Sequence, residues 1–240
     1  MGAKKMRMKL TVLLLLGALI APAPALADVV SLAPSQDGTI YSEDGALSNG
    51  AGEFVFSGRT GLSFNRRALL AFEVSRHLPP GSKITQVTLT LHVSQSPSAA
   101  QPEPFVLHRV RAAWGEGTSN AGQPGGFGTA AAPDDATWTH RLWNTTVWAT
   151  PGGDFAAAES AVAVVPVTDD GVVAWASTAT MVADVQVWLD SPASDFGWIL
   201  IGNETANRTA RRFDSRESRH QRYRPVLTIE FVPPAGGTSR

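Results

Sequence analysis

The 240-residue chain contains no cysteine and has a formal net charge of −1. The lack of cysteine excludes a disulfide framework, a Cys-ligated zinc or iron–sulfur centre, a thiol nucleophile and a lipid-modified cysteine anchor. A near-neutral charge argues against nucleic acid as a partner, because that class of binder needs a basic surface to displace counterions. With 43% hydrophobic and 17% charged residues, the composition is that of a folded domain rather than a disordered chain.

Beyond its N-terminus the sequence lacks any long apolar run, so no membrane span is expected. At the N-terminus, four basic residues within 4–9 precede an apolar run over 10–20, and Ala25 and Ala27 flank Leu26 in a small-x-small pattern. This layout predicts a secretory signal peptide over 1–27 that is cleaved before Asp28. The apolar run is shorter than the about 20 residues that a bilayer requires. We therefore expect a secreted, extracellular protein.

Lysine is nearly absent after this leader. Without residues 1–27 the chain has 16 Lys+Arg against 21 Asp+Glu, a formal charge of −5, and Lys83 is its one lysine. Arginine is the cation that binds carboxylates in a flat, bidentate geometry. Nearly half of the arginines lie close together in the sequence: Arg208, Arg211, Arg212, Arg216, Arg219, Arg222 and Arg224.

Alternation of apolar and polar residues dominates the rest of the chain and predicts half-buried strands. The clearest case is 83–93, where Val87, Leu89, Leu91 and Val93 share one face. Further strands are expected over 53–58, 67–74, 104–110, 161–168, 197–202 and 224–232. Asp170-Gly171 between two apolar runs predicts a hairpin that joins 161–168 to 172–177.

One segment has helical instead of strand periodicity. Met181, Val185 and Trp188 fall on one helical face, which predicts a short helix over 180–190 capped by Thr178 or Thr180. Many short strands with one helix predict an all-β fold, an antiparallel, jelly-roll-like β-sandwich. We expect one domain over 28–232 and a disordered tail over 233–240.

Nine short motifs follow one another along this domain. They are NRRALLAF at 65–72, LPPGSKI at 78–84, VTLTL at 87–91, WGEG at 114–117, ATW at 136–138, PGGDF at 151–155, FGWIL at 196–200, RFDSRE at 212–217 and RPVL at 224–227. Their order and spacing resemble the DNRLRE domain family of secreted bacterial and archaeal proteins. The resemblance implies an extracellular β-sandwich resembling a carbohydrate-binding module, with acidic polysaccharides such as alginate among the family's ligands. Asp195 departs from the pattern, because asparagine is expected there.

The resemblance also implies structural roles for the residues inside these motifs. They are Arg66, Arg67, Trp114, Glu116, Trp138, Arg212, Asp214, Arg216, Glu217 and Arg224. Within the arginine-rich segment, Arg212, Arg216 and Arg224 are therefore expected to pair internally with acids such as Asp214 and Glu217. His92 lies on a predicted strand and is expected to be a half-exposed polar residue.

Residues outside the motifs are the candidates for ligand binding. Arg208, Arg219 and Arg222 are expected to be exposed, and guanidinium groups match sugar carboxylates or sulfates. Trp143 and Trp148 lie in the long irregular segment 113–160, and exposed indoles stack on the apolar faces of sugar rings. The alternative is that these arginines pair internally and that the tryptophans fill the core.

A structural calcium ion is the one cofactor that the sequence suggests. Asp37, Asp44, Asn49 and Glu53 supply oxygen donors in a loop-rich segment, and calcium takes six to eight such oxygens. The spacing is not that of an EF-hand, so the prediction depends on these four side chains meeting in the fold.

Three functions fit these features. The leading hypothesis is a non-catalytic module that binds extracellular or cell-surface polysaccharide, with acidic glycans as candidate ligands. The alternative is a structural or adhesion module bound to an envelope protein. A polysaccharide lyase or hydrolase fits less well: Glu116 is the best single carboxylate, but the sequence has no Gly-x-Ser-x-Gly, His-Glu-x-x-His or phosphate-loop motif.

Overall fold

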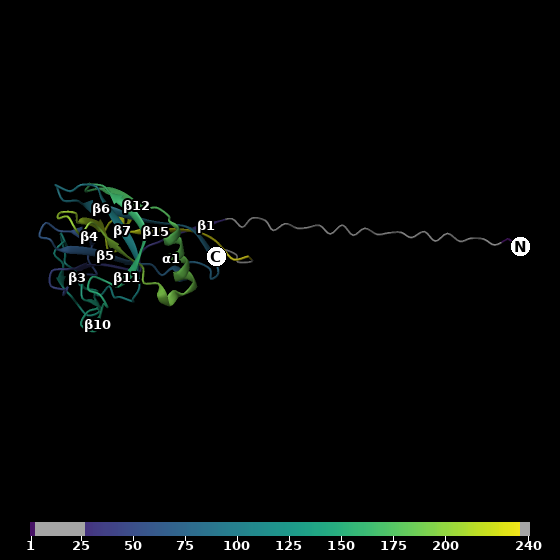
Figure 1. Cartoon of the computed structure of the whole chain (residues 1–240), viewed down its shortest axis with the longest axis horizontal. Helices are drawn as coiled ribbons and strands as arrows, with labels where there is room; N and C mark the ends of the chain where they lie inside the picture. The colour runs from purple at the N-terminus through teal and green to yellow at the C-terminus, as the bar shows by residue number, and fades with distance from the viewer. Residues whose placement is uncertain (3–26, 236–240) are drawn as a thin grey trace.

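A 13-stranded antiparallel sheet, folded into two layers, forms most of the computed structural model, which describes residues 1–2 and 27–235. Figure 1 shows the strands packed as a sandwich with α1 beside them. This confirms the predicted all-β, antiparallel sandwich. Nearly all of the predicted signal peptide, and residues 236–240 of the predicted tail, lie outside the described residues.

Strands that are distant in the sequence pair within each layer. The first layer contains β1 (Asp28–Leu32), β15 (Val226–Val232), β6 (Lys83–Gln95), β12 (Gly171–Trp175) and β14 (Arg211–Asp214). The second contains β2 (Gln36–Tyr41), β3 (Leu47–Asn49), β8 (Thr129–Ala130), β5 (Asn65–Ala71), β13 (Trp198–Ile201), β7 (Glu103–Val110) and β11 (Phe155–Val165). A separate hairpin joins β9 (His140–Leu142) to β10 (Thr146–Val147). Short 3-10 turns lie at Val74–Arg76, Pro192–Ser194 and Gln221–Tyr223.

Strand β4 (Phe54–Arg59) connects the two layers. Its first four residues pair with β14, whereas Gly58 and Arg59 pair with β5. Gly58 has a φ of 108°, and a Cβ there would lie 2.8 Å from the Cα of Ala210, so this crossing requires glycine. The end of β4 therefore lies beside β5 and beside the residues just before β14. The candidate site lies at this place.

The predicted hairpin at Asp170-Gly171 is wrong. β11 pairs with β7 in the second layer, and β12 pairs with β6 in the first, so the chain crosses between layers here. β11 and β12 each turn an apolar side to the core, but β11 belongs to the second layer and β12 to the first. The crossing is held by side chains: Asp170 contacts His92, and the Ser96 backbone N–H donates to Asp169.

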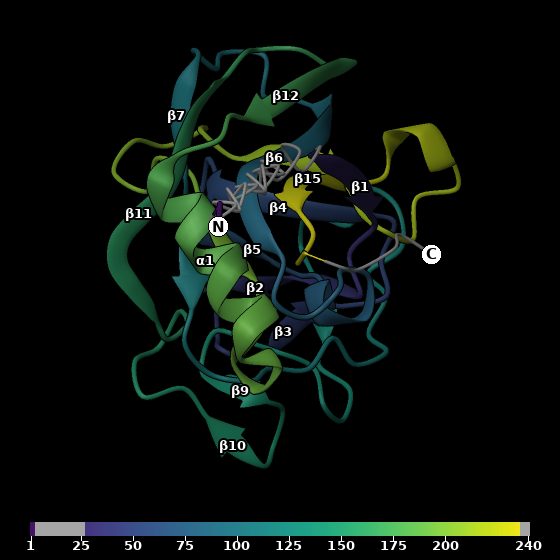
Figure 2. The same ribbon diagram turned by 90° about the vertical axis from the view of Figure 1, so that its right-hand side faces the viewer.

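The predicted helix is confirmed as α1 (Ala179–Asp190), with Thr178 as its cap, because the Thr178 hydroxyl accepts a hydrogen bond from the Met181 N–H. Its apolar face, including Val185 and Trp188, is buried in the main core. Figure 2 shows α1 lying across the side of the sandwich between β11 and β6. Within the described residues, no helix combines the length and apolar character that a membrane span requires.

Two hydrophobic clusters stabilise the fold, one on each face of the second layer. On β5, Leu70 faces the main core between the layers, whereas its neighbour Leu69 belongs to a second cluster, because adjacent strand residues point to opposite faces. The second cluster includes Trp114 and Trp148 of the long segment 113–160. The long segment therefore packs on the outer face of the second layer.

Candidate functional site

A pocket of 450 Å³ lies where the end of β4, the start of β5 and β14 meet. Five arginines line it, and we call it the arginine pocket: Arg59, Arg66, Arg208, Arg211 and Arg212. No acid is among its other lining residues, which are Phe56, Thr60, Gly61, residues 95–99, Gly126 and Ala210. The pocket is thus a concentration of positive charge on a protein whose domain is acidic overall.

Carboxylates neutralise little of this charge. Arg66 is buried, and its guanidinium forms an ion pair with Glu43, with 2.7 Å between Nη1 and Oε2, and lies over the Tyr41 ring. Among the described residues, the other four arginines of the pocket form no ion pair. The other four guanidinium groups therefore have no carboxylate as a direct hydrogen-bond partner among the described residues.

Backbone carbonyls and amide side chains hold Arg211 and Arg59 in place. Arg211 is fully buried and donates to the carbonyls of Thr209 and Gln101 at 2.9 and 2.5 Å, while its Nε has no partner. Arg59 donates to Asn207 and Asn65 at 3.0 and 3.1 Å. These contacts orient the guanidinium groups without cancelling their charge.

Arg212 and Arg208 form the more accessible part of the pocket. Arg212 donates from Nε to Ser94 Oγ at 3.0 Å, and its guanidinium carbon lies 3.9 Å from the centre of the Phe54 ring. Arg208 is exposed, runs along the backbone at Gly61, and makes no side-chain hydrogen bond to the described residues. Burial lowers the pKa of both Arg211 and Arg212, and the charges of nearby carboxylates offset part of the effect: Glu103 for Arg211, and Asp214 and Asp169 for Arg212.

An apolar hollow of 490 Å³ adjoins the arginine pocket and shares four of its lining residues: Thr60, Gly61, Arg66 and Gly126. At this hollow, Leu62 and Phe127 have exposed fractions of 72% and 74%, which is unusual for large apolar side chains. A ligand in the arginine pocket therefore has an apolar surface immediately beside it.

The three arginines predicted to bind ligand, Arg208, Arg219 and Arg222, have different surroundings in the structure. Arg208 is exposed, as predicted, and lines the arginine pocket. Arg219 is exposed, but its guanidinium forms a bidentate ion pair with Glu53 at 2.9 and 2.8 Å, so it already has a carboxylate. Arg222 is exposed and lies over the Tyr223 ring, 4.6 Å from its centre. Arg208 is the member of this set that the fold places beside other unpaired arginines.

The expectation that Trp148 is exposed is wrong. Its exposed fraction is 3%, and its Nε1–H donates to the Thr137 carbonyl at 2.9 Å. Trp143 is half-buried, with its ring edge-on to His140 at 4.9 Å between centres. The indole of Trp148 is held in the second cluster because the long segment packs on the sheet, so it offers no face for stacking.

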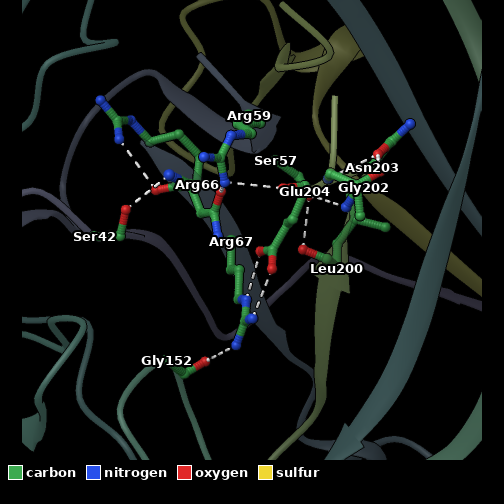
Figure 3. A network of polar contacts seen from close by, with 12 residues as sticks. Ser42, Ser57, Arg59, Arg66, Arg67, Gly152, Leu200, Gly202, Asn203 and Glu204 are labelled. Carbon is green, nitrogen blue, oxygen red and sulfur yellow. Dashed lines mark hydrogen bonds and ion pairs between the residues drawn. The ribbon is translucent and has the colours of Figure 1, made fainter. Parts of the chain in front are cut away.

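The motif residues make internal contacts, as expected of structural roles. Figure 3 shows Arg67 bound in a fork by Glu204, at 2.7 and 2.8 Å, and donating to the Gly152 carbonyl at 2.7 Å. The same guanidinium lies over Trp138. Trp114 is buried and donates to the Phe196 carbonyl at 2.9 Å. Arg67 thus attaches the long segment to β5, and Trp114 attaches it to the residues just before β13.

Of the three motif arginines that were predicted to pair with acids, one does so. Arg216 pairs with Glu116 and Glu217. Arg224 instead donates from Nε to the Ser218 carbonyl at 2.9 Å. Arg212 was expected to pair with an acid such as Asp214. The Asp214 carboxylate is instead occupied by His92 and Ser218. Arg212 therefore forms no ion pair to the described residues, although it lies near Asp214 and Asp169 in a second pocket that it also lines.

His92 differs from its prediction, because it is buried rather than half-exposed. Its two ring nitrogens contact the carboxylates of Asp214 and Asp170 at 2.7 and 2.8 Å, and its ring stacks on Tyr223 at 3.8 Å. Periodicity alone gives no signal for this arrangement, since the partners come from β14 and the crossing after β11. His92 ties these segments to β6.

The predicted calcium donors do not meet. Asp44 is exposed and accepts from the Ala46 N–H, Asn49 contacts the backbone near Phe54, and Glu53 pairs with Arg219. Asp37 is buried in a different environment, beside Glu116 and Glu217. The four-residue calcium prediction is therefore wrong, because the segment 37–53 turns through β2 and β3 and separates these side chains.

Sequence reasoning also missed Arg59, Arg66 and Arg211 as pocket residues. They come from β4, β5 and β14, and only the pairing of these strands brings them together. No family model matches the sequence, and no curated protein matches it. Resemblance to DNRLRE domains stays a prediction from the nine motifs.

Proposed function

We propose that this chain is a secreted, DNRLRE-like module that binds an anionic polysaccharide through the arginine pocket. The observation that carries the proposal is a pocket lined by five arginines, of which four have no ion pair within the described residues. Guanidinium groups bind carboxylates and sulfates through paired N–H donors. A negatively charged sugar would supply the direct ion pairs that these four arginines lack within the described part of the chain.

The neighbouring apolar hollow supports a sugar over a simple inorganic anion. Sugar rings have apolar C–H faces beside their polar groups, and an exposed aromatic ring binds such a face. Phe127 lies at the hollow that adjoins the arginine pocket. A chain of uronate residues therefore fits both features, with a carboxylate at the arginines and the next ring at Phe127.

Replacing Arg208 by alanine is expected to weaken binding of a polyuronate about 10-fold to 100-fold, because one charge-assisted hydrogen bond contributes about 1.5–3 kcal/mol. The protein is tested by affinity electrophoresis in gels that contain alginate, pectin, a sulfated polysaccharide or a neutral glucan. Arg208 is exposed and without side-chain partners, so its loss leaves the fold intact. Added salt weakens the same binding.

The matched control is Arg76→Ala, which removes an exposed arginine outside the pocket. Arg208→Lys keeps the charge but loses the planar fork, and it is expected to recover only part of the affinity. Unretarded migration of the wild-type protein in every gel contradicts the proposed function. Equal losses in Arg208→Ala and Arg76→Ala place the site elsewhere.

Replacing Phe127 by alanine is expected to weaken binding of a uronate tetrasaccharide about threefold to tenfold and to leave binding of a single uronic acid unchanged. Removing an aromatic platform costs of the order of 1 kcal/mol for the ring that stacks on it. Isothermal titration with both ligands measures the two affinities. Val172→Ala, at an exposed valine on β12 that lines neither hollow, serves as the control. Unchanged tetrasaccharide affinity in Phe127→Ala contradicts a role for the apolar hollow.

A further inference from the structure

Three carboxylates converge away from the arginine pocket. Asp37 lies on β2, Glu116 in the long segment, and Glu217 just after β14. One carboxylate oxygen from each lies within 4.8 Å of the others. The three segments are distant in the sequence, so the fold alone creates this cluster.

A single arginine accompanies the three acids. The Arg216 Nε lies 2.7 Å from Glu116 Oε1 and 2.8 Å from Glu217 Oε1, and the Arg216 backbone N–H donates to Asp37 Oδ2 at 2.7 Å. The Asp37 N–H in turn donates to Glu116 Oε1 at 2.8 Å. Since an ionised carboxylate has about four lone-pair positions, these bonds leave acceptor positions free on all three residues. One guanidinium also leaves two of the three negative charges uncompensated.

The Asp37 carboxylate lacks, among the described residues, a partner that its burial requires. Its side chain is fully buried, and its Oδ1 has no hydrogen-bond partner. A buried carboxylate oxygen without a partner costs free energy unless a cation or a proton compensates it. Burial, followed by the charge of Glu217, raises the pKa of Asp37 well above its ordinary value, and burial also raises the pKa of Glu217.

We propose that Asp37, Glu116 and Glu217 bind a divalent cation, with calcium as the best fit. Calcium holds oxygens at about 2.3–2.6 Å, so two ligands of one ion lie up to about 5 Å apart. The three carboxylate oxygens all lie within 4.8 Å of one another, which is inside this limit. Calcium also accepts irregular coordination that water completes. This suits three carboxylates that are each also bonded to Arg216.

The bound ion joins β2, the turn at Glu116 and the segment after β14. In a chain without cysteine, this is a cross-link between distant segments that needs no disulfide. Binding to the folded state alone raises the unfolding temperature in proportion to the logarithm of the ion concentration. The site shares no lining residue with the arginine pocket, so it is independent of the proposed function.

The test compares the melting temperature of the purified protein in EDTA and in 1 mM CaCl₂. We expect calcium to raise the midpoint by about 5 °C, and we expect Tb³⁺ to give sensitised luminescence on tryptophan excitation that calcium displaces. Asp37→Asn is expected to abolish both signals. In EDTA it is expected to melt no lower than the wild type, since a buried charge has been removed. Glu217→Gln is the second variant, and it keeps the test decisive if Asp37→Asn folds poorly.

The control is Asp44→Asn, which removes an exposed acid from the same part of the chain and is expected to retain both signals. Persistence of the calcium shift in both Asp37→Asn and Glu217→Gln overturns the assignment of these ligands. A wild-type protein with neither a calcium-dependent shift nor Tb³⁺ luminescence overturns the proposal, and a proton then neutralises Asp37.

Discussion

Replacing Trp148 by alanine is expected to lower the free energy of unfolding by about 3–5 kcal/mol, the usual cost of removing a buried tryptophan. Trp148 has an exposed fraction of 3% and packs in the second cluster with Leu69 and Trp114. Its Nε1–H also donates to the Thr137 carbonyl, which loses this partner in the variant. Urea denaturation followed by tryptophan fluorescence and circular dichroism measures the loss.

Trp143→Ala is the matched comparison, because it removes the same side chain from the same long segment at a half-buried position. We expect a loss below about 1.5 kcal/mol, since Trp143 contacts chiefly the ring of His140. Similar losses for the two variants contradict the separation of these tryptophans into a core and a surface residue. A small loss for Trp148→Ala means that the long segment does not depend on the second cluster.

Replacing Asp195 by asparagine is expected to stabilise the protein at pH 8 by about 2 kcal/mol and to change little at pH 4. Burial raises the pKa of Asp195 from its ordinary 3.8 to about 7, and the charge of Glu73 adds to the effect. A shift of this size corresponds to about 4 kcal/mol, which solvent around this partly exposed group reduces. Asp195 Oδ1 has no hydrogen-bond partner, which agrees with a poorly solvated carboxylate.

The sign follows from proton binding. The folded state holds the Asp195 proton more tightly than the unfolded state does, so this group's contribution to stability is greatest below about pH 4. It declines as the pH rises and is lost once the pH passes about 7, where the folded carboxyl ionises. Asparagine keeps an oxygen to accept from the Val74 N–H at this position and has no such pH dependence.

Chemical denaturation from pH 4 to pH 8 measures the difference between the wild type and Asp195→Asn, so the titration of all other groups cancels. Asp190→Asn, at an exposed acid five residues earlier, is the control and is expected to show no such trend. A difference that is constant across this range contradicts the raised pKa of Asp195. Asparagine is also the residue that the DNRLRE resemblance leads us to expect at 195.

Local patterns predicted most of the strands and the helix. Alternation over 83–93 and 224–232 correctly identified β6 and β15, and the apolar face around Val185 identified α1. These patterns are reliable because periodicity depends on neighbours a few residues apart. The hairpin at Asp170-Gly171 failed because a turn signal does not determine which partner strand each flanking segment finds.

The candidate site was predictable only in part. Arg208 was identified from its place in an arginine-rich segment outside the motifs, and it lines the pocket. Arg59 and Arg66 lie nearly 150 residues earlier, and no local signal connects them to Arg208. The exposure of Phe127 and the burial of Trp148 likewise depend on how the long segment packs on the second layer.

Composition and periodicity alone predict a cysteine-free, all-β domain whose positive charge is almost entirely arginine. Which of these charges are compensated depends on the fold. The fold pairs Arg219 with Glu53, places Arg216 among three acids, and leaves Arg208 in the arginine pocket without an ion pair to the described residues. Charges compensate one another only over a few ångströms. Strand pairing sets which side chains come that close, and distance along the chain does not.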